Sequence, residues 1–124
     1  MNKYEKINRK LSEMFAEILI DFALKAESKE EEKIMILMAK EIWNISYFDK
    51  DAQETEIDEF INSLDITEES ITKKYSNMMR KGIRDKKKNT KEYELKDVWT
   101  RVEQLKVWKI KGRYKMEFEL DFYE

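Results

Sequence analysis

The sequence predicts a mainly helical α+β protein with four to five helices, including a helix-turn-helix, and a C-terminal β-hairpin. The chain has no proline and only two glycines in 124 residues, so few positions interrupt a helix. Apolar residues recur at three-to-four residue spacing along most of the chain, and the period changes to two only near its end. With 41% hydrophobic residues, this length suits one domain over residues 1–124.

Two helices are predicted in the acidic part, residues 1–50. The first covers residues 3–26, where apolar side chains fall on one face. Ser28 followed by Glu31 is the pattern of a capping box, so a second helix begins there. This helix is apolar on most sides, which predicts either the buried centre of the monomer, the favoured alternative, or an oligomer contact. Residues 48–54 are interpreted as a polar connector.

The third and fourth helices are predicted to form a helix-turn-helix that continues into a basic extension, residues 55–91. Thr55 is the expected cap of a short third helix whose apolar face holds Ile57, Phe60, Ile61 and Leu64. Asp65-Ile66 forms the turn. Thr67 then caps the fourth helix, and Gly82 ends that helix in a left-handed conformation.

Residues 92–124 are predicted to form a fifth helix and a hairpin. A loop at residues 86–88 precedes a cap at Asn89 or Thr90, and apolar residues then recur at helical spacing: Leu95, Val98, Trp99, Val102 and Leu105. Strands over residues 106–110 and 114–122 follow, joined by a two-residue turn at Lys111-Gly112. Trp99 and Trp108 could stack on bases, but their apolar faces favour a place in the core.

The composition excludes several classes of function. His and Cys are absent, which removes the commonest general base, thiol nucleophiles and the usual soft-metal ligands. Pairs such as Glu68 and Glu69 could hold magnesium, but carboxylates at this density favour a solvated face. No apolar run approaches the roughly 20 residues that cross a bilayer, and residues 1–10 lack a signal-peptide core. We expect a cytoplasmic non-enzyme without catalytic residues, cofactor, metal, membrane contact or small-molecule substrate.

Charge is divided along the chain. Residues 1–70 carry 9 Lys/Arg against 18 Asp/Glu, a net charge of −9, whereas residues 71–124 carry 16 against 9, a net charge of +7. Residues 72–91 hold nine cations and one carboxylate, a net charge of +8. Such a block can bind polyphosphate by releasing condensed counterions, or it can be a solvated helix face.

The run Leu64-Asp65-Ile66-Thr67-Glu68-Glu69-Ser70-Ile71, followed by cations, resembles the core of helix-turn-helix regulators of the LuxR and sigma-factor kind. In those proteins a Leu-Gly-Ile-Ser-Glu turn precedes a helix with Val or Ile and then Lys or Arg. The resemblance covers residues 59–81 and departs from the pattern at Ile61, where a small residue is usual, and at Asp65, where Gly is usual. A plain helical hairpin is the alternative, and the basic block favours the helix-turn-helix.

The resemblance implies a DNA-binding protein that acts in transcription regulation, or an accessory factor, of phage or mobile-element type. Side chains expected to approach bases or phosphates are Ser70, Lys73, Lys74 and Asn77. Side chains expected to hold the backbone are Arg80, Lys81, Arg84, Lys86, Lys87 and Lys88. The expected partner is duplex DNA, bound by a homodimer. The alternative is an anti-CRISPR-like or anti-restriction-like inhibitor whose acidic surface occupies the nucleic-acid channel of a host nucleoprotein complex.

Overall fold

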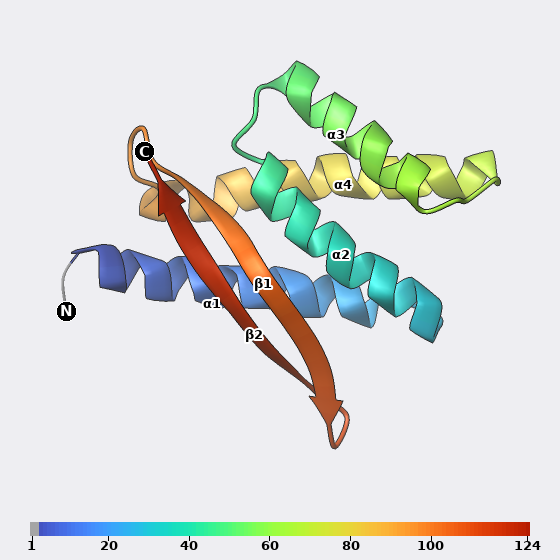
Figure 1. Cartoon of the computed structure of the whole chain (residues 1–124), viewed down its shortest axis with the longest axis horizontal. Helices are drawn as coiled ribbons and strands as arrows, with labels where there is room; N and C mark the ends of the chain where they lie inside the picture. Colours follow the sequence, from blue (N-terminus) through green and yellow to red (C-terminus); the bar gives the residue numbers. More distant parts are fainter. Residues whose placement is uncertain (1–2) are drawn as a thin grey trace.

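The computed structural model describes residues 3–124 and contains four helices followed by an antiparallel two-stranded hairpin (Figure 1). The mainly helical fold with a small β part is confirmed. In chain order the elements are α1 (Lys3–Leu24), α2 (Lys29–Ile45), α3 (Lys50–Ser63), α4 (Glu69–Thr90), the 3-10 turn η1 (Lys91–Tyr93), β1 (Trp99–Ile110) and β2 (Arg113–Tyr123).

The start of α2 is fixed by the predicted capping box. The Ser28 hydroxyl accepts a hydrogen bond from the Glu31 amide at 3.1 Å, and the Glu31 carboxylate accepts one from the Glu27 amide at 3.0 Å. Towards its end α2 is buried on most sides, with Met38, Ile42 and Trp43 fully enclosed. The prediction that this helix is the buried centre of the monomer is therefore confirmed.

α3 begins earlier than predicted. The Asp49 carboxylate accepts a hydrogen bond from the Ala52 amide at 2.9 Å and caps the helix, so residues 50–54 are helical rather than a connector. Thr55, the predicted cap, lies inside the helix and donates to the Asp51 carbonyl oxygen. A carboxylate at the helix N-terminus also interacts favourably with the helix dipole.

α4 is longer than predicted, because Gly82 does not end it. The helix continues to Thr90, so residues 86–88 are helical and not a loop. A Cβ atom at Gly82 would lie 2.6 Å from the Ile42 side chain, which shows that the glycine lets α2 and α4 pack closely. Thr67 is not the cap; the N-cap is Glu68, which makes no side-chain capping bond. Asp65 takes the left-handed conformation in the turn, with φ of 56°.

The predicted fifth helix is wrong, since its residues form a 3-10 turn, an irregular segment at residues 94–98 that contains Leu95 and Val98, and the first half of β1. The last part of the apparent helical spacing comes from a β-bulge between Glu103 and Lys106, where Gln104 has φ of 52°. The extra residue places Val102 and Leu105, three apart, on the same side of the hairpin. A helical spacing therefore arises within a strand. The predicted two-residue turn at Lys111-Gly112 is confirmed, with both residues at positive φ.

The inner face of the hairpin packs over α1 and α2, while α4 lies behind α2 in Figure 1. The Phe15 ring links the layers, with ring centroids 5.7 Å from Trp43 and 4.9 Å from Phe118. No helix among residues 3–124 combines the length and apolarity that crossing a membrane requires. α2 is thus covered by α4 on one face and by the hairpin on another.

Candidate nucleic-acid interface

The basic block lies mainly on one exposed face of α4. The buried residues of this helix repeat every three to four positions: Tyr75, Met79, Ile83, Lys86 and Thr90. At about 100° per residue, this repeat turns most of the cations to the opposite side. We call this side the basic face; its members are Lys73, Lys74, Arg80, Lys81, Arg84, Lys87, Lys88 and, just beyond the helix, Lys91.

The first half of the basic face is partly neutralised by carboxylates. Lys73 pairs with Glu69 at 3.4 Å. The Arg80 guanidinium bonds to the Glu54 carboxylate on α3 at 2.9 Å and to the Asn77 side chain at 3.1 Å. Such half-exposed or exposed pairs add little stability, but they reduce the positive potential around the first turns of the helix.

The second half of the basic face carries the free charge. Arg84, Lys87, Lys88 and Lys91 are exposed, and among residues 3–124 none of the four forms an ion pair. Lys81 pairs with Asp85 at 3.7 Å, where both side chains are more than half exposed. A polyanion would therefore meet the strongest unpaired positive charge near the C-terminal end of α4.

Most of the side chains predicted to bind DNA are accessible. Ser70, Lys73, Lys74, Asn77, Lys81, Arg84, Lys87 and Lys88 are exposed, and Arg80 is half-buried. Lys86 is the exception, because its side chain is 2% exposed and points toward α2. It cannot reach a phosphate while the fold is intact, and we leave it out of the interface.

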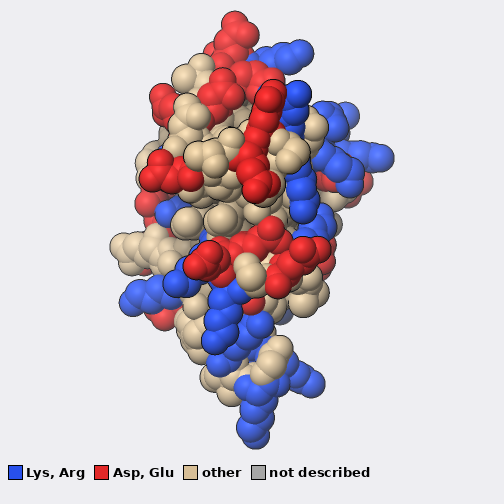
Figure 2. Space-filling view, turned by 90° about the vertical axis from the view of Figure 1, so that its right-hand side faces the viewer, with Lys and Arg blue, Asp and Glu red and all other residues tan. Residues whose placement is uncertain are grey.

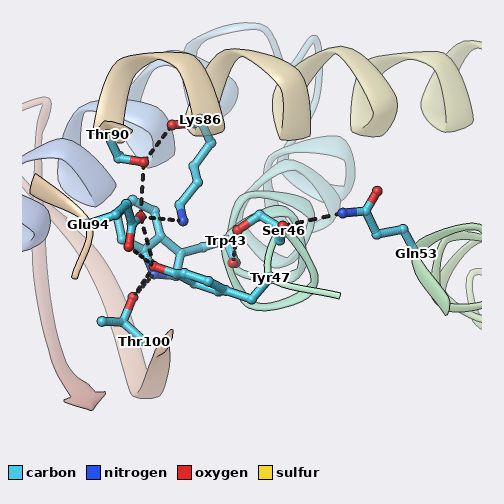
Figure 3. Close-up of polar contacts among 8 residues, drawn as sticks. All are labelled: Trp43, Ser46, Tyr47, Gln53, Lys86, Thr90, Glu94 and Thr100. Atoms are coloured by element: carbon cyan, nitrogen blue, oxygen red, sulfur yellow. Dashed lines mark hydrogen bonds and ion pairs between the residues drawn. The ribbon is translucent and has the colours of Figure 1, made fainter. Parts of the chain in front are cut away.

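Lys86 instead lies at the centre of a buried polar cluster (Figure 3). Its ammonium group is 3.0 Å from a Glu94 carboxylate oxygen, 3.7 Å from the centroid of the Tyr47 ring and 4.5 Å from that of Trp43. Glu94 also accepts hydrogen bonds from the hydroxyl groups of Thr90 and Tyr47, both at 3.0 Å. The cluster joins α2 and α4 to the segment that leads into β1.

Burial controls the pKa values in this cluster. It lowers the pKa of Lys86 to about 8, although the nearby Glu94 carboxylate opposes the shift. Burial likewise raises the pKa of Tyr47, so its hydroxyl stays protonated and remains a donor to Glu94. The residues are enclosed by packed side chains, and the cluster is best explained as a structural connection.

The lowered pKa of Lys86 predicts that the protein becomes more stable as pH rises from about 8 to about 10.5. The unfolded chain keeps Lys86 protonated up to its ordinary pKa of 10.5, whereas the folded chain releases the proton near pH 8. The free energy of unfolding should therefore rise with pH, by at most about 1.4 kcal/mol per pH unit from this group. Urea unfolding at three pH values measures the slope. An equal slope in Lys86→Met would contradict the assignment.

The charge division of the sequence is also a division in space (Figure 2). Lys and Arg gather along the right-hand side and at the lowest point, while Asp and Glu gather over the upper part and across the middle. The upper part contains α3, whose exposed acidic residues include Asp51, Asp58 and Glu59. The lowest point is the hairpin turn.

The hairpin tip is a second basic surface. Residues 106–115 hold five cations and no carboxylate. The cations are Lys106, Lys109, Lys111, Arg113 and Lys115, all of them exposed. This local charge excess is visible in the sequence, although it is less dense than the block at residues 72–91.

Neither a metal site nor a relative identifies the function. Within the described part of the chain, no three acidic side chains are grouped so that they could hold a metal ion. Comparisons with protein-family models, curated proteins and solved structures found no match for this chain. The proposal of a function therefore rests on the geometry and charge of the exposed surfaces.

Proposed function

We propose that this protein binds duplex DNA through the basic face of α4, as a non-enzymatic regulator of transcription or an accessory factor of phage or mobile-element type. The observation that carries the proposal is the unpaired second half of that face, with Arg84, Lys87, Lys88 and Lys91 exposed together. Each cation that neutralises a phosphate releases condensed counterions, which supplies affinity without reading sequence.

The helical geometry supports this assignment. α4 has 22 residues, and at 1.5 Å per residue it is about 33 Å long, close to one turn of B-DNA. Residues 64–68 join it to α3, a short connection that a helix-turn-helix and a plain helical hairpin share. Because the free cations lie far from the start of α4, we expect contacts to the phosphate backbone to dominate over base contacts.

A salt series with random duplex DNA tests the proposal. We expect log Kd to rise linearly with the logarithm of the salt concentration, with a slope of about 0.9 for each phosphate that the protein contacts. Arg84→Ala/Lys87→Ala/Lys88→Ala should reduce that slope by almost 3 and weaken binding at low salt by about tenfold or more. Fluorescence anisotropy measures both quantities. Absence of binding by the unmodified protein at low salt, or binding that salt does not weaken, would refute the proposal.

Two further variants sharpen the test. Lys6→Ala/Lys29→Ala/Lys33→Ala removes the same charge from exposed positions on α1 and α2, and it should leave the slope unchanged. Lys73→Ala/Lys74→Ala removes two charges from the first half of the basic face, where a sequence-reading helix would contact bases. Because it removes less charge than the Arg84 triple variant, a larger loss of affinity from this pair would show that base contacts dominate.

The separate acidic surface favours one alternative function. The exposed carboxylates of α3 could occupy the nucleic-acid channel of a host nucleoprotein complex, as an anti-CRISPR-like or anti-restriction-like inhibitor does. This alternative would be supported if the protein captures such a complex, if Asp51→Asn/Asp58→Asn/Glu59→Gln abolishes the capture, and if the protein has no affinity for DNA.

We also propose a homodimer, because one short interface usually binds DNA weakly. Sedimentation at micromolar protein concentration tests the oligomeric state.

A further inference from the structure

The hairpin tip has the chemistry of a nucleic-acid contact. Beyond the bulge, the cross-strand pairs Trp108–Lys115 and Ile110–Arg113 share the outer face of the hairpin, which the helices do not cover. Trp108 and Ile110 are 43% and 51% exposed. Residues two apart on a strand repeat about every 6.8 Å, so Arg113 and Lys115 can follow neighbouring phosphates.

The hairpin and the basic face of α4 point in different directions. Two consecutive residues of α2 show this, because side chains one residue apart on a helix diverge by about 100°. Glu31 accepts a hydrogen bond from Tyr75 of α4 at 2.8 Å. Glu32 instead bonds the hairpin, at 2.7 Å from the Tyr114 hydroxyl and 3.1 Å from the Lys109 ammonium.

The basic face lies farther away still, on the side of α4 that is turned from α2. The residues of α4 that face α2 include Tyr75, Lys86 and Gly82, the last lying against Ile42. Figure 2 accordingly shows the cations along the right-hand side separated from those of the hairpin turn by a band of carboxylates. One straight duplex that contacts the basic face would not reach the outer face of the hairpin.

We propose that the hairpin tip is a second duplex-DNA site, so that one protein molecule bridges two duplexes. The bridging rests on the proposed function of α4, whereas the hairpin site does not. A two-stranded ribbon has the width to enter the major groove. Lys109 is paired with Glu32 and Lys106 lies opposite Glu117, so the tip presents Lys111, Arg113 and Lys115 to a polyanion. Two half-exposed apolar side chains offer little area for insertion into a bilayer, which favours DNA over an anionic membrane.

A capture assay tests bridging directly. One duplex is fixed to beads, the protein is added, and retention of a second, fluorescent duplex is measured. The tip variant Lys111→Ala/Arg113→Ala/Lys115→Ala should retain binding to a single duplex but capture at least about fivefold less of the second. The Arg84→Ala/Lys87→Ala/Lys88→Ala variant should also lose capture, and the Lys6→Ala/Lys29→Ala/Lys33→Ala control should not.

The outcomes separate the two proposals. The first outcome concerns binding to a single duplex. If the tip variant weakens this binding and the Arg84 triple variant does not, the α4 site is refuted and the hairpin site is retained. Unchanged capture by the tip variant refutes the hairpin site alone. Loss of a dimer in the tip variant, measured by sedimentation, would assign capture to dimerisation and overturn the proposal. A membrane role would also overturn the hairpin site. It would be shown if the protein binds phosphatidylserine vesicles, if Trp108→Ala/Ile110→Ala abolishes this vesicle binding, and if the tip variant still captures the second duplex.

Discussion

Glu94→Gln is expected to lower the free energy of unfolding by about 3 kcal/mol, because it leaves the buried Lys86 ammonium without its counter-charge. The substitution keeps the shape of the side chain, so packing changes little. Lys86 is held between the rings of Tyr47 and Trp43 and is 2% exposed, so its ammonium group is poorly solvated even though the Glu94 side chain is 23% exposed. Urea unfolding followed by far-UV circular dichroism measures the loss.

The double variant Lys86→Met/Glu94→Gln distinguishes the ion pair from general damage to the fold. With both charges removed, no uncompensated ion is buried, and the thioether can lie against both rings; stability should return to within about 1 kcal/mol of the unmodified protein. Lys87→Met, on the exposed side of the same turn, should change stability by less than about 0.5 kcal/mol. A Glu94→Gln variant as stable as the Lys87→Met control would show that the pair is not needed.

Lys86 also shows where analysis of the sequence alone reaches its limit. A lysine between Asp85 and Lys87 belongs to a local basic run, and such runs are usually solvated. Its position is decided by Trp43, which is far away in the sequence and forms the wall against which α4 packs. A signal existed, because Tyr75, Met79, Ile83 and Lys86 follow one helical period. The predicted helix end at Gly82 hid that signal.

Local chemistry predicted the start of α2 correctly, but not the caps of α3 and α4 or the end of α4. The capping box at Ser28 was identifiable because its two hydrogen bonds join residues only three or four apart. The end of α4 depends on tertiary packing instead: Gly82 is explained by its close approach to Ile42, which no local pattern reveals. The bulge at Gln104 likewise changed the apparent period of β1. The exposed cations of the candidate site, by contrast, were largely identified, since charge density requires no tertiary information.

Asn44→Leu is the second substitution with a large expected effect, a loss of about 2–4 kcal/mol. The Asn44 side chain accepts a hydrogen bond from the Val102 amide at 2.8 Å and donates one to the Val102 carbonyl oxygen at 3.3 Å. It thereby binds the backbone of β1 as a neighbouring strand would. Val102 is fully buried, so leucine would leave both backbone groups without a partner and without water.

Hydrogen exchange at the Val102 amide makes this prediction specific to the hairpin. In the unmodified protein this amide should be among the best protected, because its acceptor is the buried side chain of Asn44. Asn44→Leu should lower the protection factor of the Val102 amide more than it lowers those of the α3 amides. The hairpin loses a direct attachment to α2, while α3 keeps its contacts with α4. Asn62→Ala, at an exposed position of α3, serves as the matched control. Equal loss of protection at Val102 in both variants would mean that the Asn44 amide does not hold β1 in place.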